Sequence, residues 1–481
     1  MRKLLIIFFL IVFQQVNAQQ KWNLQSCVEY AMKNNYNVSQ SEVQAKINAL
    51  SYKQSKLSQI PSATFGTNSA FNSGSNQDPT TFSRVTENYI SAGMQLQSSA
   101  EIFNFFSKKY TIASNHWELM ANLANVSKIK NDIALSTANA YLQVLLSLQQ
   151  VKITEIQIQQ TQSQLNTTNK MVEAGTLPPL NSTQLEAQLA NDSSNYISAK
   201  GNASQTILSL KALMNIDASV LFEIEEPSVD SIPLELIADL QPEYVYEQAL
   251  KNQPQQLSDE YKLKAAQKMK LASKASMYPT VSAFGNLSSS YLYFTPKPIY
   301  NKILNGYQST GLIATDGNGV VYDVQSPDFI NGDISTYYKS KSFSAQFSDN
   351  LRKSIGISIS VPLFNGSNAK TMYEKSKLNV QSIEIQKAQN NQKLKQDIYQ
   401  AYDAAVVALQ KYNASNKSVE ANTKAYDYAV KRFNIGALST FDLISTQNNL
   451  LRAKLDNTLN HFDYVFKMKV LEFYKGAGLK L

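Results

Sequence analysis

Residues 431–447 read KRFNIGALSTFDLISTQ, and they separate two stretches that each have the pattern of a helix. The first stretch, from about Ala369 to Ile435, contains neither proline nor glycine, the residues that most disfavour a helix interior. At 1.5 Å per residue this helix would be on the order of 100 Å long. The run stops at Gly436, where a left-handed helix cap is least costly, and a second helix is predicted over Thr440–Tyr474. A long helical hairpin is therefore predicted.

The same arrangement occurs earlier in the chain. A stretch without proline or glycine runs from about Phe106 to Glu173, stops at Gly175, and is followed by a predicted return helix over Asn181–Met214. Matching residues in the two stretches lie 261 positions apart: Phe103-Asn104 with Phe364-Asn365, Ala140-Tyr141 with Ala401-Tyr402, and Gly175 and Leu177 with Gly436 and Leu438. A fixed spacing over such a distance indicates an internal repeat.

The beginnings of the two repeats match at a different spacing. Residues 29–35, EYAMKNN, correspond to residues 247–253, EQALKNQ, 218 positions later, and Pro61 corresponds to Pro279. The difference between the spacings, 43 residues, indicates an insertion between Pro279 and Phe364. We place it at about 295–350, a segment rich in Gly, Asn, Asp, Ser and Tyr. The predicted organisation is a first structural repeat over 19–240 and a second over 241–481, with an inserted loop at about 295–350 that we expect to be extracellular.

Each repeat also contains two predicted strands. Ser354–Val361 alternates strictly between polar or small residues and branched apolar residues, and Tyr89–Ser98 has the same period. Thr64–Gly74 and Thr280–Phe294 are predicted as strands mainly because they precede these two. Each repeat opens with a helical stretch, Leu24–Leu57 or Tyr244–Met277, with breaks near Asn37 and Pro254.

Four strands per chain cannot form a closed barrel, and open sheet edges leave backbone groups unpaired in lipid. About eight strands close a barrel that its own side chains fill. Two copies would give such a filled barrel, whereas three copies would give twelve strands and room for a lumen. The long helices, with many Gln, Asn, Ser, Thr and Ala and an imperfect coiled-coil seam, suit packing side by side around water.

The quoted stretch 431–447 resembles the helix-turn signature of the TolC outer-membrane factors: Arg and an aromatic residue, then Gly, Ser or Thr, and Asp-Leu. The opening Trp22-Asn23-Leu24 and the run Val361–Asn365 also resemble that family, over essentially the whole mature chain. The resemblance implies a mixed fold of helices and β-barrel. In it a homotrimer forms a twelve-stranded barrel in the outer-membrane lipid, and long coiled-coil helices form a periplasmic tunnel. It further implies a periplasmic adaptor (membrane fusion) protein and an inner-membrane pump as partners, and an exit duct of a tripartite efflux or type I secretion system.

The resemblance also implies site residues, carried over position by position. The helix turns would be the tips that dock the adaptor, at Gly175, Leu177, Gly436, Leu438 and Ser439. A periplasmic gate would include Asp442, Ser445, Asn181 and Phe433. Asp442 would belong to a ring of three carboxylates that favours cations. Ser445 and Asn181 stand where acidic residues occur in some family members. An alternative role for Asp442 is a carboxylate at a helix start, which the helix dipole favours.

The N-terminus has the features of a signal peptide over residues 1–18. Arg2 and Lys3 precede the apolar run Leu4–Phe13, and Val16-Asn17-Ala18 forms a small-residue cleavage site. Cys27 follows Leu24-Gln25-Ser26, which offers a second hypothesis of lipid attachment. We favour a buried thiol, because mostly polar residues separate Cys27 from the apolar run.

The sequence lacks the residues that other functional classes require. One Cys and two His argue against a disulfide framework and a histidine metal site, and we expect no cofactor. The net charge of +8 is spread along the chain without a basic run, which argues against nucleic-acid binding. No phosphate loop or catalytic constellation indicates an enzyme. The remaining alternative is a periplasmic coiled-coil adaptor or structural protein, although adaptors usually carry one helical hairpin rather than two.

Overall fold

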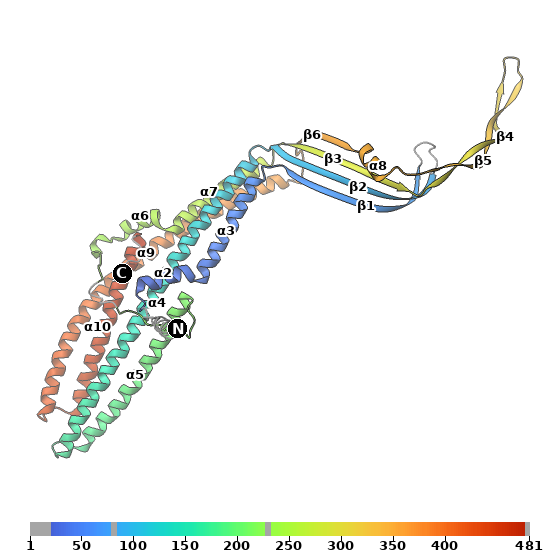
Figure 1. The fold of residues 1–481 in the computed structure, drawn as a ribbon. Coiled ribbons are helices and arrows are strands. Elements are labelled where there is room, and N and C mark those ends of the chain that lie inside the picture. Colours follow the sequence, from blue (N-terminus) through green and yellow to red (C-terminus); the bar gives the residue numbers. More distant parts are fainter. Residues whose placement is uncertain (1–20, 78–83, 227–231, 477–481) are drawn as a thin grey trace, which may run out of the picture. The chain divides into compact units, whose positions relative to one another are not determined.

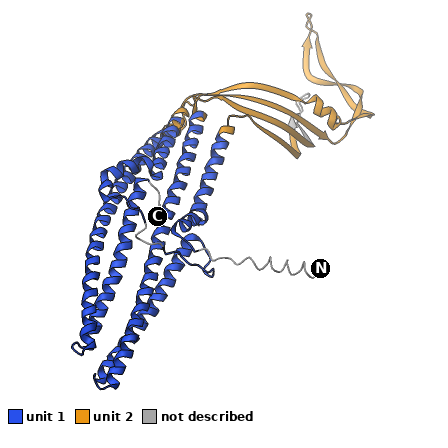
Figure 2. Ribbon diagram, turned by 60° about the vertical axis from the view of Figure 1, so that its left-hand side comes forward, with its two compact units in different colours: residues 1–55, 109–271, 371–481 blue, residues 56–108, 272–370 orange. Residues whose placement is uncertain are grey.

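The computed structural model of the protein describes residues 21–77, 84–226 and 232–476, so the predicted signal peptide lies outside the described residues. The chain forms two compact units (Figure 2). The helical unit contains the residues up to 55, 109–271 and 371 onward, and the sheet unit contains 56–108 and 272–370. Among the helices described, none combines the length and the hydropathy that a membrane crossing requires.

The main helices recur in pairs of equal length and in the same order (Figure 1). The pairs are α2 (Leu24–Asn34) and α6 (Pro242–Asn252) with 11 residues each, α3 (Tyr36–Leu57) and α7 (Pro254–Ala275) with 22, α4 (Ser107–Glu173) and α9 (Asn368–Asn434) with 67, and α5 (Pro179–Met214) and α10 (Thr440–Lys475) with 36. Their bounds lie close to those predicted from the positions of proline and glycine.

The breaks within the opening helical stretches have local causes. Asn35 ends α2 and starts α3: its side-chain Oδ1 accepts the amide of Asn37 at 2.8 Å, and its Nδ2 donates to the carbonyl of Leu213 at 2.9 Å. The break therefore falls two residues before the predicted Asn37. In the second repeat the break falls at Gln253, directly before Pro254, because the residue before a proline is disfavoured in the helical region.

Each short helix packs against the long and return helices of its own repeat. One core joins α2 to α4 and α5 and includes Cys27, Ala31, Tyr141 and Leu210, whereas a separate core joins α6 to α9 and α10 through Val245, Ile398 and Met468. Buried leucine, isoleucine and methionine side chains of this kind each stabilise a fold by about 1.5–3 kcal/mol. Phe462 and Phe466 of α10 also belong to the first core, so this core packs the two repeats against each other.

A buried ion pair fixes the segment that precedes α6. Lys469 and Glu472 on α10 pair at 2.8 Å with less than a tenth of either side chain exposed. Lys469 Nζ also donates to the carbonyl of Pro233 at 2.7 Å, and Glu472 accepts the amide of Glu235 at 3.1 Å. These extra hydrogen bonds satisfy groups that would otherwise make a buried ion pair costly.

The sheet unit contains a four-stranded antiparallel sheet in the order β1-β2-β3-β6. Its strands are β1 (Ser62–Gln77), β2 (Arg84–Phe103), β3 (Thr280–Phe294) and β6 (Arg352–Ser360). All four predicted strands are present, and β3 has the predicted bounds. β1 and β6 are the edges of this sheet.

The inserted segment is more ordered than the predicted loop. It contains a hairpin of β4 (Lys297–Thr315) and β5 (Val321–Tyr338), followed by the short helix α8 (Phe343–Asp349). A turn at Asp316 joins β4 to β5, and the carboxylate Oδ1 of Asp316 accepts the amides of Asn318 and Val320 at 2.9 Å each. Asparagine and glycine in this turn supply the backbone conformations that a hairpin needs.

Helix α8 covers the part of β3 that lies beyond its pairing with β6. The side chain of Gln346 accepts the amide of Leu292 at 3.0 Å and donates to its carbonyl at 2.8 Å, as a neighbouring strand would. Asn350 Nδ2 donates to the carbonyl of Ser290 at 2.7 Å. These side chains satisfy backbone groups of an otherwise exposed sheet edge.

Candidate functional site: a two-faced sheet and two helical turns

One face of the four-stranded sheet is apolar. The cross-strand register aligns Phe65, Leu96 and Leu287, and the same face carries Ile357 and Ile359 of β6. Ile355, also on this face, is 92% exposed, so nothing in its own chain covers it. Further members of the face are Phe71, Ile90, Met94, Val281, Tyr291 and Tyr293. Thr67, Ser69, Ser289 and Lys353 also lie on this face, and Tyr291 packs against Phe343. An exposed face on which apolar side chains predominate in this way indicates contact with lipid or protein.

The opposite face is polar and mostly uncharged. Thr64, Gln97, Asn286 and Ser354 form one row across all four strands. Other members are Asn68, Gln95, Ser282, Ser288 and Ser358, with Glu101 and Arg352 as charged residues. Phe284, Leu292 and Phe294 are apolar exceptions on this face. The ring of Phe284 lies over Gly356, where an added Cβ would approach the ring to 2.7 Å. Alternation between a mainly apolar and a mainly polar face is the pattern of strands between lipid and water.

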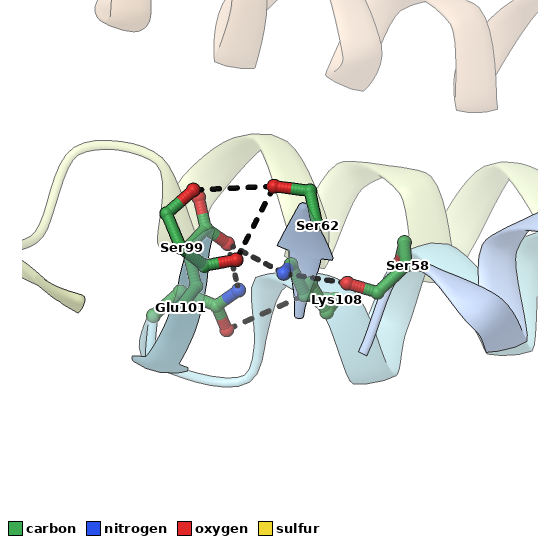
Figure 3. Close-up of polar contacts among 6 residues, drawn as sticks. Ser58, Ser62, Ser99, Glu101 and Lys108 are labelled. Carbon is green, nitrogen blue, oxygen red and sulfur yellow. Dashed lines mark hydrogen bonds and ion pairs between the residues drawn. The ribbon is translucent and has the colours of Figure 1, made fainter. Parts of the chain in front are cut away.

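A polar cluster lies at the end of β2 that leads into α4 (Figure 3). Lys108 pairs with Glu101 at 3.1 Å and donates to the carbonyl of Ser58 at 2.8 Å. Ser62 and Ser99 hydroxyls lie 3.2 Å apart on the polar face of the sheet. These contacts link β1 to β2, and they link Lys108 to Glu101 of β2 and to Ser58 before β1.

The two helical turns have the same backbone geometry. Gly175 and Gly436 have φ values of +71° and +74°, which favour glycine. The amides after them, of Thr176 and Ala437, donate to carbonyls five residues earlier at 2.9 and 2.8 Å. This is the Schellman pattern of helix ends, as predicted for both glycines.

The structure brings the two turns together. Phe433 is 1% exposed and forms a small core with Ala429 and Leu443, and Leu177 and Leu438 pack against that core. Leu177 belongs to the α4–α5 turn and the others to the α9–α10 hairpin. Phe433 therefore holds the turns in position from inside the helical unit.

The remaining predicted gate residues lie nearer the surface. Asp442 and Ser445 are exposed in the first two turns of α10, and Asn181 is half-buried in the first turn of α5. Ser439 is the N-cap of α10: its Oγ accepts the amide of Asp442 at 3.1 Å and donates to the Asp442 carboxylate at 2.7 Å. Asp442 thus fills the helix-start position that the alternative role predicts, while its side chain stays accessible to solvent.

Sequence reasoning missed a buried polar layer near these turns. The Thr161 hydroxyl of α4 donates to Asp192 of α5 at 2.6 Å, and Gln447 of α10 donates to Thr161 at 3.3 Å. Gln188 donates to the other carboxylate oxygen of Asp192 at 2.8 Å. The layer links the two helical hairpins by hydrogen bonds rather than by apolar contact. Polar residues are frequent throughout these helices, so no periodic signal distinguishes this layer.

Cys27 is a buried thiol on α2, fully inaccessible in the core between α2, α4 and α5. Burial raises its pKa to about 12. A lipid-bearing cysteine would be a processed, accessible N-terminus, so the structure favours the buried-thiol interpretation. Among the described residues, no group of three or more His, Cys, Asp and Glu could hold a metal ion.

A two-faced sheet together with two long helical hairpins defines the class of outer-membrane channels with helical extensions. The outer membrane efflux protein family matches residues 28–215 and 327–461 of the chain. The chain belongs to the outer membrane efflux protein family. This membership confirms the predicted family, the outer-membrane location and the exit-duct function over the adaptor alternative. A search of curated proteins found no match to the chain.

Solved structures share the fold at low sequence identity. CusC superposes with a TM-score of 0.73 at 15% identity, covering 94% of this chain and 92% of CusC. VceC from Vibrio cholerae gives 0.70 at 14% identity, covering 95% and 97%. The open state of the MtrE channel from Neisseria gonorrhoeae gives 0.69 at 16% identity, covering 95% and 89%. The similarity extends over nearly the whole chain and confirms the mixed helical and β fold.

The cap of α10 is testable by substitution. Ser439→Ala should weaken the first turn of α10 by about 1 kcal/mol, because the amide of Asp442 loses its acceptor. Ser439→Asn should restore the cap, because Asn caps about as well as Ser. Hydrogen exchange of the α10 amides measures the change, with the exposed Ser445→Ala as control. Equal exchange in the Ala and Asn variants would show that the cap does not stabilise the turn.

Proposed function

We propose that three copies of the chain close their sheets into one twelve-stranded barrel, and that this duct conducts solutes or polypeptides passively from the periplasm to the exterior. The carrying observation is the four-stranded sheet with two free edges, one apolar face and one polar face. Lipid cannot satisfy the backbone groups of β1 and β6, so each edge requires a strand from another copy. Twelve strands leave a lumen, whereas eight are filled by side chains.

The polar face suits the wall of such a lumen. Its Ser, Thr, Asn and Gln side chains hydrogen-bond to water without a strong field that would hold a charged solute. The apolar face, with Ile355, Ile357 and Ile359, suits lipid. CusC is described in terms of transmembrane channel formation and MtrE as an outer membrane channel, which supports the same assignment here.

The helical turns are the proposed periplasmic end of the duct. Long helices would carry the lumen into the periplasm, and the tips at Gly175, Leu177, Gly436, Leu438 and Ser439 would dock a periplasmic adaptor joined to an inner-membrane pump. Leu177 and Leu438 share one core with Phe433, so both turns would meet an adaptor as a single surface. The long helices of the two repeats have equal lengths, which supports the proposed duplication. Two similar hairpins per chain would give six hairpins around the three-fold axis of the proposed trimer.

The stoichiometry is the first test. Native mass spectrometry of the mature protein, purified in detergent from outer membranes, should give three chains per particle. Three chains agree with the twelve strands that a lumen requires. A particle of one chain that is soluble without detergent would contradict the duct.

Asp442 is the proposed charged residue of the periplasmic gate, with Ser445 and Asn181 as polar neighbours and Phe433 as its packing support. Asp442→Asn should lower the cation preference of the channel in planar bilayers and weaken block by Mg²⁺ about tenfold, because three carboxylates in a constriction are removed together. The variant keeps an acceptor for Ser439, so the helix cap is retained.

Asp456→Asn on the same helix is the matched control for charge, since Asp456 is exposed and far from the turn. It should leave both cation preference and Mg²⁺ block unchanged. If Asp442→Asn behaves like Asp456→Asn, Asp442 acts only as a helix-start residue and the acidic gate is rejected.

A further inference from the structure

The β4–β5 hairpin exposes many apolar side chains. Those at least 44% exposed include Ile299, Ile303, Leu304, Tyr307, Leu312, Ile313, Val321, Tyr322, Phe329 and Ile330. A two-stranded hairpin is marginally stable in water, and exposed apolar surface of this extent indicates a partner. The proposed duct assigns no role to the apolar surface of this hairpin.

The distal half of the hairpin has two unlike faces. Leu312 pairs with Val324, and Ala314 pairs with Tyr322, so one face is wholly apolar. Ile313 pairs with Asp323 on the other face, and Asp323 accepts the hydroxyl of Ser309 at 2.6 Å. The difference between the faces favours one face turned inward and the other turned to water.

Lipid does not suit this ribbon as a partner. The outer edges of β4 and β5 pair with no strand among the described residues, and hydrocarbon would leave their amides and carbonyls unsatisfied. The edges of the ribbon therefore need water, and only its apolar face needs a partner. A second copy of the same hairpin, packed through the same face, covers that face and leaves the edges in water.

In the proposed trimer, the hairpins of the other two copies lie near this hairpin. β3 ends at Phe294 and β4 begins at Lys297, so a short connection joins the hairpin to the sheet. In the proposed trimer three hairpins start from one barrel, which gives them a high effective concentration for each other. Four register shifts and Pro327 interrupt the edges, which disfavours open-ended pairing and suits a closed group.

We propose that the three β4–β5 hairpins of one trimer pack against each other through the face of Leu312, Ala314, Tyr322 and Val324, forming a collar beyond the barrel. The proposal rests on the trimeric duct and assigns a further interface to it. Asp323 and Ile313 lie on the outer face of the collar.

Adjacent cysteine variants test the collar, because neighbouring residues of a strand face opposite sides. Leu312→Cys and Ile313→Cys are matched, since these residues are 65% and 69% exposed in one chain. Tyr322→Cys and Val321→Cys, at 54% and 58%, repeat the comparison on the other strand. Cys27→Ala removes the native thiol from all four variants. The full-length trimer is reacted in detergent with a hydrophilic maleimide, and separately with a thiol oxidant.

The thiols at 312 and 322 should react about tenfold more slowly than those at 313 and 321, because they become accessible only when the hairpins separate. Oxidation should join two chains in the Leu312→Cys variant and not in Ile313→Cys. Equal labelling of both faces in a confirmed trimer would overturn the collar alone. Slow labelling at position 312 without cross-linking would show that detergent or lipid covers this face. That result would also overturn the collar. One chain per particle in native mass spectrometry would overturn the trimer and the collar together.

Discussion

The unpaired backbone of β1 and β6 is the constraint on which the rest of the structure depends. A polypeptide in lipid must satisfy every amide and carbonyl, and four strands in an open sheet leave two edges unpaired. In the proposed trimer, pairing between copies would satisfy β6 and the facing part of β1. Beyond β6 the chain uses side chains instead: Gln346 of α8 and Asn350, the C-cap of α8, hydrogen-bond to the edge of β3. The short β6 and the helix α8 thus act together to end the sheet without exposed backbone.

The helical unit is subject to a different constraint: its long helices must pack side by side although they carry few apolar side chains. Each repeat has a compact core where its 11-residue helix meets the long and return helices, as at Tyr141 and Ile398. Toward the turns, packing combines polar layers such as Thr161, Asp192 and Gln447 with small apolar contacts, among them the core around Phe433 and the buried Leu185. Water can replace the partners in such hydrogen bonds at a small net cost, which suits the proposed role of these helices beside a water-filled duct.

The sequence predicted those parts of the fold whose signals are local. Proline and glycine positions gave the helix bounds, and period-two alternation identified β2 and β6. The β4–β5 hairpin was expected to be a loop because the inserted segment is rich in Gly, Asn, Asp, Ser and Tyr. The register shifts of this hairpin interrupt the period-two pattern that would have identified its strands. The polar layer could not be predicted because its partners lie 31 and 286 residues apart. Both turn glycines and the Ser439–Asp442 cap were identifiable, because their geometry depends on neighbours in the chain.

The central claim is that the polar face of the sheet lines a water-filled lumen. Four single cysteines in β2, at Met94, Gln95, Leu96 and Gln97 in a Cys27→Ala background, test it in planar bilayers. A charged thiol reagent should reduce the conductance of the Gln95 and Gln97 variants and leave the Met94 and Leu96 variants unchanged, because successive strand residues face opposite sides. Equal effects at all four positions, or effects only at Met94 and Leu96, would contradict the proposed lumen.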